Sequence, residues 1–381
     1  MAIDTDRFSL KSYGGNLRAY AMILALVLIW GLFSFATDGG FMTARNLSNL
    51  ARQSCITGIL AIGMVLVIVS ANIDLSVGSM VGLTGGIAAI LNVWSELGIL
   101  PVLGITLATG LVIGLLQGWL VSYLRIPAFI VTLAGLLVFR GIIKGGTGGE
   151  TVGPVSDTFK ILGQGYLGVE VSWIIATVVV AVMFSAVWRR YVKRKQQNIR
   201  SGGWAELVKG LLITAAIVLF VSTMTRYEGI PVPVMILLTL ALIFHFLTTN
   251  TTFGRRVYAI GGNVEAAHLS GINIRWNTTV VFVLMGILGA VAGMIYTARV
   301  GSATADAGKI LELDAIAACV IGGTSLMGGR GTIGGALVGA LIMASLDNGM
   351  SLMNVEDFYQ DIIKGLILVI AVWIDIASKK K

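Results

Sequence analysis

The chain has 381 residues, of which 56% are hydrophobic and only 12% are charged, and its mean hydropathy is +0.90. A soluble domain carries about 25% charged residues and could not hide this much apolar surface. The composition therefore excludes an ordinary soluble protein and indicates an all-α, polytopic membrane protein. The formal charge of +8 does not indicate nucleic acid as a partner, because lysine and arginine in a membrane chain report its topology.

About twelve apolar segments follow one another along the chain, each near the roughly 20 residues that cross a bilayer. They lie at 19–36, 54–71, 75–92, 99–122, 127–144, 171–188, 207–224, 231–249, 278–298, 312–327, 332–348 and 361–377. Because some C-terminal segments are short, we expect about 10–12 transmembrane or half-membrane helices, with glycine-rich breaks. The polar segment 1–18 lacks a small-residue cleavage site, so we do not expect a removable signal peptide there.

The lysines and arginines predict which side of the membrane each loop occupies. With both termini in the cytoplasm and alternating spans, 18 of the 27 basic residues fall inside and 9 outside. The segment 1–18 and the basic tail 378–381 are then cytoplasmic, as is the basic loop 189–206, and the loop 145–170 is outside. We expect one transmembrane domain over residues 19–377.

Polar residues interrupt two apolar stretches at membrane depth. In "VSANIDLSVGSMVGLTGGIAA", 69–89, Asn72, Asp74 and Ser76 occupy a gap too short for a solvated loop. Irregular backbone at this depth must face protein or a water-filled cavity. We expect Asp74 to be the N-cap of a helix that begins at Leu75. The three residues are either structural or part of the solute path or its gate.

The second interruption is rich in glycine. Residues 312–349 contain short apolar pieces separated by glycines at 322, 323, 328, 329, 331, 334 and 335, a pattern typical of a tightly packed helical hairpin. Asp347 and Asn348 end the second piece and are further candidates for the path or gate. The breaks at 72–86 and 322–335 are candidates for corresponding parts of two structural repeats, as in many transporters.

The chain carries no motif that could supply energy or catalysis. It has no GxxxxGK[ST] loop for phosphates, no HExxH or CxxC metal motif, and no embedded series of acids and histidines for a proton relay. Cys55 and Cys319 lie in apolar runs and are interpreted as small hydrophobic residues. We therefore expect no catalytic residues, no cofactor and no metal. A pore that cannot itself hydrolyse a nucleotide or relay protons is either a passive channel or a subunit whose energy comes from another protein.

The stretch "YAIGGNVEAAHLSGINIR", 258–275, is small and polar between long apolar blocks, and it lies on the cytoplasmic side of the predicted topology. Asn263 is a good N-cap, Glu265 suits the first turn, and Gly271 can stop the helix in a left-handed conformation. The two turns between them are too short to be stable alone. We expect the helix to dock onto a partner, with Ala266 and Ala267 as a slim face; the alternative is a connector on the membrane surface.

Four motifs together resemble the sugar-type permeases of bacterial ABC importers, which are related to the branched-chain amino-acid permeases. They are "IDLSVGS" at 73–79, "IPAFIVTLAG" at 126–135, "FGRRVYAIGGNVEAAHLSGI" at 253–272 and "AACVIGGTSLMGG" at 317–329, and the resemblance runs from about 40 to 378. It implies that 262–272, within the cytoplasmic loop 250–277, is the coupling helix that rests in a cleft of the ATP-binding subunit. The residues implied are Gly262, Asn263, Glu265, Ala266, Ala267, Ser270 and Gly271.

The resemblance also implies partners. These are a second copy of the chain, two ATP-binding subunits or one tandem ATPase, and an extracytoplasmic sugar-binding protein, all at the bacterial inner membrane; ATP would be bound by the partner subunit. Likeness to the D-xylose branch rests on 344–355, 37–50 and an added pair of spans at 171–224. No spacing selects a sugar. An ion-coupled secondary transporter, a passive sugar channel and a membrane enzyme stay open as alternatives.

Overall fold

A computed structural model describes residues 10–196 and 203–379, so parts of the polar segment 1–18, of the basic loop 189–206 and of the tail 378–381 lie outside the described residues. The described chain forms helices, with two isolated β-bridges, Val152–Ala303 and Tyr166–Pro231. The helices of the first half are α1 Leu10–Ala36, η1 Gly40–Met42, α2 Ala44–Val69, α3 Val77–Ala89, η2 Ile90–Trp94, α4 Ile99–Ser122, α5 Ala128–Thr147, α6 Asp157–Gln164 and α7 Val169–Gln196. Those of the second half are α8 Gly203–Thr225, α9 Val232–Asn250, α10 Thr252–Gly262, α11 Val264–Leu269, α12 Ile274–Val300, α13 Leu311–Ile321, α14 Ile333–Leu352 and α15 Asp357–Lys379.

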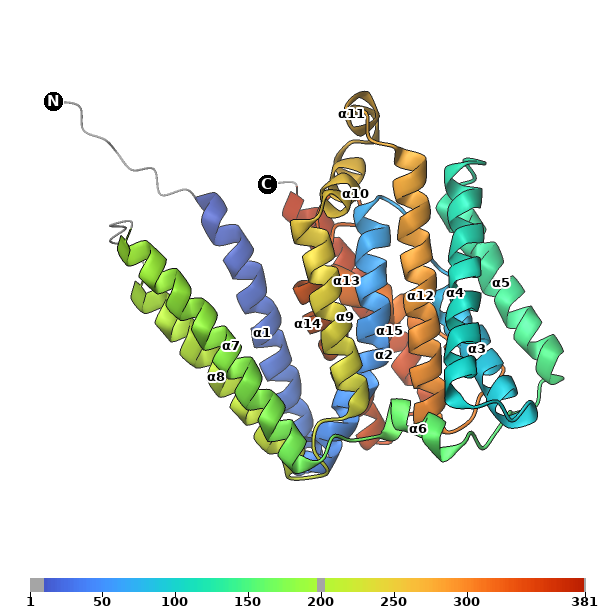
Figure 1. Cartoon of the computed structure of the whole chain (residues 1–381), viewed down its shortest axis with the longest axis horizontal. Helices are drawn as coiled ribbons and strands as arrows, with labels where there is room; N and C mark the ends of the chain where they lie inside the picture. Colours follow the sequence, from blue (N-terminus) through green and yellow to red (C-terminus); the bar gives the residue numbers. More distant parts are fainter. Residues whose placement is uncertain (1–9, 197–202, 380–381) are drawn as a thin grey trace.

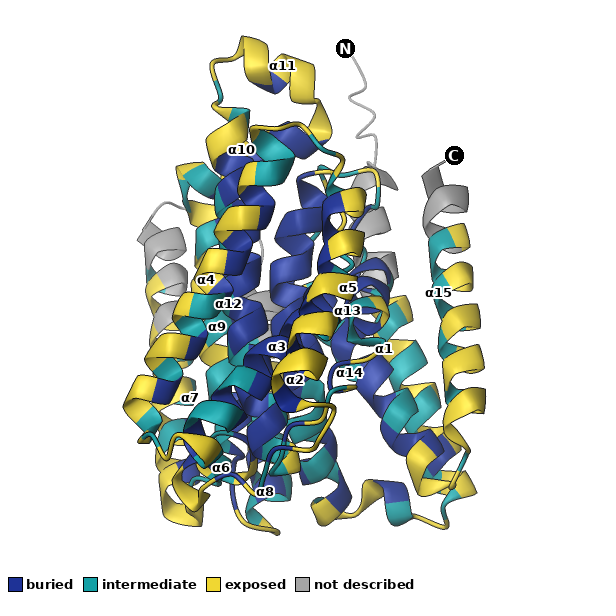
Figure 2. Ribbon diagram, turned by 90° about the vertical axis from the view of Figure 1, so that its right-hand side faces the viewer, coloured by how far each residue is buried: buried dark blue, intermediate teal, exposed yellow. Residues whose placement is uncertain are grey.

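The long helices run up and down as a bundle, in which α13, α14 and α15 lie behind α9, α2 and α12 (Figure 1). The first described residues of α1 and the last of α15 lie at the same edge of the bundle as α10 and α11, and α6 lies at the opposite edge (Figures 1 and 2). We call these the α11 edge and the α6 edge. Both described ends of the chain therefore lie at one edge of the bundle, and the side of the membrane that they face stays a prediction.

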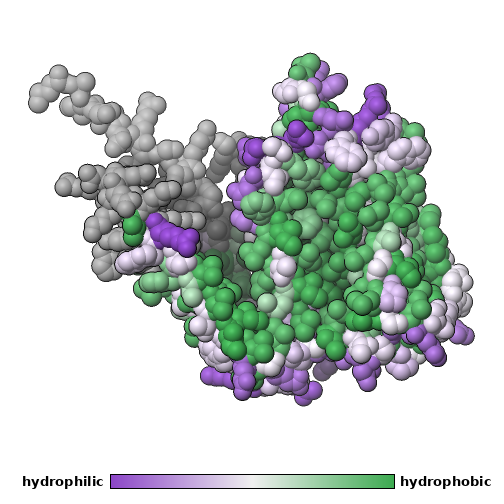
Figure 3. Space-filling view, in the orientation of Figure 1, coloured by the Kyte–Doolittle hydropathy of each residue, from purple (hydrophilic) through white to green (hydrophobic). Residues whose placement is uncertain are grey.

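On the face of the bundle drawn in Figure 3, a broad apolar belt lies between two hydrophilic edges. Eight helices are long and apolar enough to cross a membrane, and Tyr20–Ala36 and Gly210–Thr225 are shorter apolar helices, counted over the described residues. Each of the predicted apolar segments overlaps a helix, although 312–327 runs past the end of α13 at Ile321 into the following turn. The all-α polytopic prediction is therefore confirmed, because only helices or closed barrels can satisfy the backbone in hydrocarbon.

The core lies around α2, whose residues from Cys55 to Val69 are all buried (Figure 2). Helix α2 packs against α12, α13 and α14, and α12 in turn packs closely on α3 and α4. On α4 and α12 the contact is made by backbone: a Cβ on Gly110 would overlap the Gly286 carbonyl oxygen, and one on Gly114 would overlap that of Phe282. Glycine thus allows the close approach on which helix association in lipid depends.

The predicted hairpin at 312–348 forms as α13 and α14, joined by a turn over residues 322–332. Helix α13 has only 11 residues, which at 1.5 Å each is about 16 Å, or half of a hydrocarbon core of roughly 30 Å. It is a half-helix. Its first turn lies against the start of α3, because a Cβ on Gly78 would overlap both the Glu312 carboxylate and the Gly308 carbonyl oxygen.

The added pair of helices, α7 and α8, diverges from the bundle toward the α11 edge and joins it at the α6 edge (Figure 1). There Ala176, Val221 and Met224 form a small buried cluster with Cys55 of α2. The backbone of Leu167 donates to the Ile230 carbonyl (2.9 Å), and that of Val232 donates to the Gly165 carbonyl (2.9 Å). The α7–α8 pair is therefore attached to the bundle through its ends at the α6 edge.

Candidate functional site

Helix α10 is an amphipathic helix that lies across the α11 edge of the bundle (Figure 2). Its buried residues, Gly254, Val257, Ile260 and Gly261, recur at helical spacing and face the bundle, whereas Arg255 and Arg256 are exposed. The Thr251 hydroxyl accepts from the Gly254 backbone N–H (3.2 Å) and begins the helix. One residue, Asn263, separates α10 from α11.

Helix α11 projects beyond the rest of the described chain and has defined ends (Figure 1). The Asn263 side chain accepts from the Ala266 backbone N–H (2.9 Å), so the predicted N-cap is confirmed. Glu265 lies exposed in the first turn, and the Ser270 hydroxyl donates to the Ala266 carbonyl (2.8 Å). Gly271 has φ +78°, as predicted for a left-handed stop.

The outward surface of α11 differs from the predicted alanine face. Ala267 is only 4% exposed and packs against the chain itself, so it is not available to a partner. The exposed positions are Val264 (48% exposed), Glu265, Ala266, His268 and Leu269 (84% exposed). Val264 and His268 also line a cavity beneath the helix. A helix of six residues has too few turns for periodicity to tell its two faces apart, which is why the sequence assigned both alanines to one face.

Beneath α10, two breaks in the bundle come together. The Gly329 backbone N–H donates to the Val69 carbonyl at the end of α2 (2.9 Å), and the Tyr258 hydroxyl donates to the Gly331 carbonyl (2.7 Å). Burial raises the pKa of Tyr258, which keeps the hydroxyl protonated as a donor. The end of α2, just before the break at 72–86, thus lies against the middle of the break at 322–335; the equivalence of the two breaks as repeats stays a prediction.

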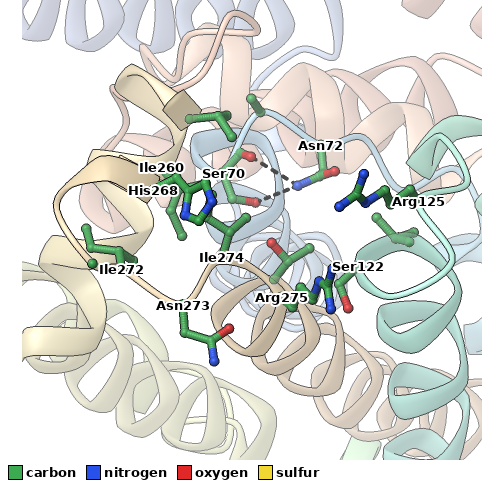
Figure 4. Close-up of a pocket in the computed structure, with 15 residues that line it drawn as sticks. Ser70, Asn72, Ser122, Arg125, Ile260, His268, Ile272, Asn273, Ile274 and Arg275 are labelled. Carbon is green, nitrogen blue, oxygen red and sulfur yellow. Dashed lines mark hydrogen bonds between the residues drawn. The ribbon is translucent and has the colours of Figure 1, made fainter. Parts of the chain in front are cut away.

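A cavity of about 820 Å³ lies between α11, the start of α12, the end of α4 and the break after α2 (Figure 4). Polar side chains line it from every one of these segments: Ser70, Asn72, Ser122, Arg125, His268, Asn273 and Arg275. Asn72 donates to the Ser70 carbonyl (3.0 Å) and hydroxyl (3.1 Å). The cavity therefore places one of the predicted path residues directly below α11.

Asp74 and Ser76 lie deeper, where both are fully buried. The expectation that Asp74 caps a helix from Leu75 is wrong, because α3 begins at Val77 with Ser76 as its N-cap. The Asp74 carboxylate instead accepts from the Ser76 backbone N–H (2.8 Å) and hydroxyl (2.7 Å), closing a turn before the helix. Gln117 of α4 donates to the same hydroxyl (2.8 Å), a partner that sequence analysis missed.

One oxygen of Asp74 and the amide oxygen of Gln117 are buried without a hydrogen-bond partner among the described residues. Such groups are costly inside a membrane protein and mark places with a function or with bound water. Asn72 lines the cavity, and Asp74 and Ser76 follow it in the chain into the buried interior; we call these three residues the polar strip.

Asp347 and Asn348, the other predicted path residues, lie elsewhere. Asp347 is paired with Lys364 of α15 (2.9 Å), which also pairs with Asp314 of α13 (3.3 Å). The structure thus joins α13, α14 and α15 through three charged side chains. Two of them, Asp314 and Lys364, were not singled out from the sequence, although opposite charges inside the segments 312–327 and 361–377 were a usable signal.

Asn348 is held by Asn46 of α2 in a reciprocal amide pair with distances of 2.8 and 3.1 Å. Replacing Asn348 by Ala leaves a buried amide without its partner, so we expect the free energy of unfolding to fall by roughly 1–3 kcal/mol. Thermal unfolding in detergent measures this. In a double-mutant cycle, Asn46→Ala should cost less in the Asn348→Ala background; strictly additive losses would show that the pair contributes nothing.

The described residues contain no cluster of three or more histidine, cysteine or acidic side chains that could hold a metal. Cys55 and Cys319 are free and buried, as expected of small hydrophobic residues. What the geometry does provide is a capped, exposed helix at one edge, joined through α10 to broken helices and a polar strip in the bundle. Together with the apolar belt, these features define a polytopic helical membrane protein whose bundle contains interrupted helices and buried polar residues.

Comparison with known proteins identifies similar membrane permeases. The family model described as branched-chain amino acid transport system, permease component, matches residues 46–372, and the chain belongs to this family. The chain is 49% identical to a xylose transport system permease protein of Haemophilus influenzae, over 98% of this chain and 100% of the relative. The identity to the Escherichia coli K12 protein of the same name is 49%, over 96% and 93%. A ribose import permease protein of E. coli K12 is 35% identical over 93% of this chain and 92% of the relative. No solved structure matches the chain.

Proposed function

We propose that the chain is the membrane-spanning permease subunit of an ATP-driven ABC importer for a monosaccharide, and that the sugar is D-xylose. The observation that carries the proposal is the 49% identity, over nearly the whole length, to permeases named for xylose transport. The 35% identity to a ribose permease supports the monosaccharide class and makes ribose the nearest alternative.

In this proposal α11 couples the permease to a separate ATP-binding subunit. Its exposed surface supports the role: Leu269 offers a large apolar contact, and Glu265 offers a charge in the first turn. Short exposed helices with large apolar side chains are costly in water unless a partner covers them. The α11 edge is then cytoplasmic and both termini lie inside, in keeping with the excess of lysine and arginine predicted for that side.

The complete assembly contains a second copy of the chain, two ATP-binding subunits or one tandem ATPase, and an extracytoplasmic sugar-binding protein. Closure of the ATPase pair on ATP would displace α11, and the displacement would alternate access to the path. The polar strip of Asn72, Asp74 and Ser76 is the proposed lining or gate of that path. The binding protein selects the sugar, so the strip need not bind it tightly.

The test is uptake of labelled sugar into proteoliposomes that contain the purified chain. We expect D-xylose uptake only with the ATP-binding subunit, ATP and the sugar-binding protein together, and we expect excess unlabelled xylose to compete better than ribose. Uptake that depends on a Na⁺ or proton gradient would support an ion-coupled transporter. Equilibration without any partner would support a passive channel, and either result would overturn the proposal.

A further inference from the structure

We infer that a junction of backbone atoms between α10 and the two helix breaks, centred on Gly261, transmits displacement of α11 into the bundle. The glycine junction, as we name it, consists of Val69, Gly261, Gly328, Gly329 and Gly331. The inference rests on the proposed function, because it requires that a partner moves α11. It assigns Gly261 and Tyr258 as positioning residues that act through the segments they contact.

The first contact joins α10 to the break after α2. A Cβ on Gly261 would overlap the Val69 carbonyl oxygen and lie 2.7 Å from the Gly329 backbone nitrogen. These two atoms are themselves hydrogen-bonded at 2.9 Å. The backbone of Gly261 therefore packs directly against the hydrogen bond that links the end of α2 to the turn between α13 and α14.

The second contact joins α10 to that turn itself. Gly328 and Gly329 have φ values of +86° and +70°, a conformation that side chains rarely adopt, and a Cβ on Gly328 would lie 2.6 Å from the Gly261 carbonyl oxygen. The Tyr258 hydroxyl, one helical turn earlier, donates to the Gly331 carbonyl (2.7 Å). Helix α10 thus contacts the turn at two positions on one face, Gly261 and Tyr258.

At Gly261 the backbone of α10 meets the backbone of Val69 and Gly329 with no side chain between them, and this decides how the contact responds to force. A long side chain can change rotamer and absorb a shift of α11, whereas close-packed backbone cannot. Only Asn263 separates α10 from α11, so a displacement of α11 reaches Gly261 directly. From there it acts on the polar strip beyond Val69 and on the half-helix α13, which are the parts of the bundle where helices are already interrupted.

The test compares two Gly→Ala substitutions at the α11 edge in the reconstituted complex with its ATP-binding subunit, sugar-binding protein and D-xylose. Gly261→Ala places a methyl group inside the junction. Gly334→Ala, at the start of α14, is the matched control, because a Cβ there would meet nothing within 4 Å. We expect Gly261→Ala to lower the sugar transported per ATP hydrolysed by about tenfold. ATP hydrolysis and retention of the ATP-binding subunit should persist, and Gly334→Ala should match the unmodified chain.

Tyr258→Phe provides a milder second variant, in case Gly261→Ala does not assemble. It keeps the ring and removes only the hydrogen bond to the Gly331 carbonyl, and we expect it to lower transport per ATP by about threefold. The ratio of transport to hydrolysis is informative because a loss of stability alone reduces both rates together. Unchanged ratios in Tyr258→Phe and in any folded Gly261→Ala would overturn the inference.

The experiments distinguish failure of the proposed importer function from failure of the glycine junction alone. If the unmodified complex shows no ATP-dependent uptake, or if changes in α11 do not affect binding of the ATP-binding subunit, the proposed function fails and the junction has nothing to transmit. If the unmodified complex is coupled and both junction variants are equally coupled, only the inference fails, and the glycine junction is packing alone.

Discussion

Gly271→Pro is expected to reduce ATP-driven sugar uptake to background while the chain stays in the membrane. The Gly271 backbone N–H donates to the His268 carbonyl (2.9 Å), and its φ is +78°. Proline has no N–H and requires φ near −65°, and it also disfavours the helical conformation of the preceding Ser270. The end of α11 and its connection to α12 should therefore be lost, together with the surface proposed to bind the ATP-binding subunit. Uptake into proteoliposomes and co-purification of that subunit measure the two effects.

Gly271→Asn is the control for this prediction, because asparagine tolerates the left-handed conformation better than other residues with side chains. It should retain the larger part of uptake. Glu265→Arg tests the same surface without altering the backbone, by reversing the exposed charge in the first turn of α11. Full uptake in both Gly271→Pro and Glu265→Arg would show that α11 is not the coupling segment.

Lys364→Met is expected to destabilise the fold more than any other single change considered for the bundle. Lys364 pairs with Asp347 (2.9 Å) and Asp314 (3.3 Å), and the Asp314 side chain is only 4% exposed. Removal of the ammonium group leaves two carboxylates close together without a counter-charge, for which we expect a loss of about 3–5 kcal/mol in the free energy of unfolding. A lower melting temperature in detergent and a lower yield in membranes are the measurements.

The matched control removes all three charges at once. In Lys364→Met combined with Asp314→Asn and Asp347→Asn, no unpaired charge remains, and most of the lost stability should return. If Lys364→Met alone melts like the unmodified chain, the three side chains do not stabilise the contact of α13, α14 and α15. In that case Asp347 would again be a candidate for a residue of the solute path.

The spans and the ends of α11 were predictable from sequence because both depend on local properties. The length of an apolar run sets a membrane helix, and Asn263 and Gly271 define α11 through contacts within a few residues of themselves. The position of Asp74 was misjudged by the same local reasoning. An aspartate before an apolar run can be the N-cap of a helix or can close a turn before the helix begins. Here Asp74 closes such a turn with Ser76, which also accepts from Gln117 of the distant helix α4.

The remaining features depend on contacts between distant parts of the chain. Asn46 and Asn348 are 302 positions apart, and no spacing rule connects them. The meeting of Gly261 with Val69 and Gly329 likewise requires the path of the whole bundle. Glycine-rich composition indicated close packing somewhere, but a single chain does not reveal which glycines face one another.

Two backbone hydrogen bonds link residues 165–167, before α7, to residues 230–232, after α8, and so hold the two ends of the α7–α8 hairpin together. Because these bonds bring the segments that enter α7 and leave α8 together, we expect that the hairpin can be replaced by a short linker while α6 and α9 keep their places.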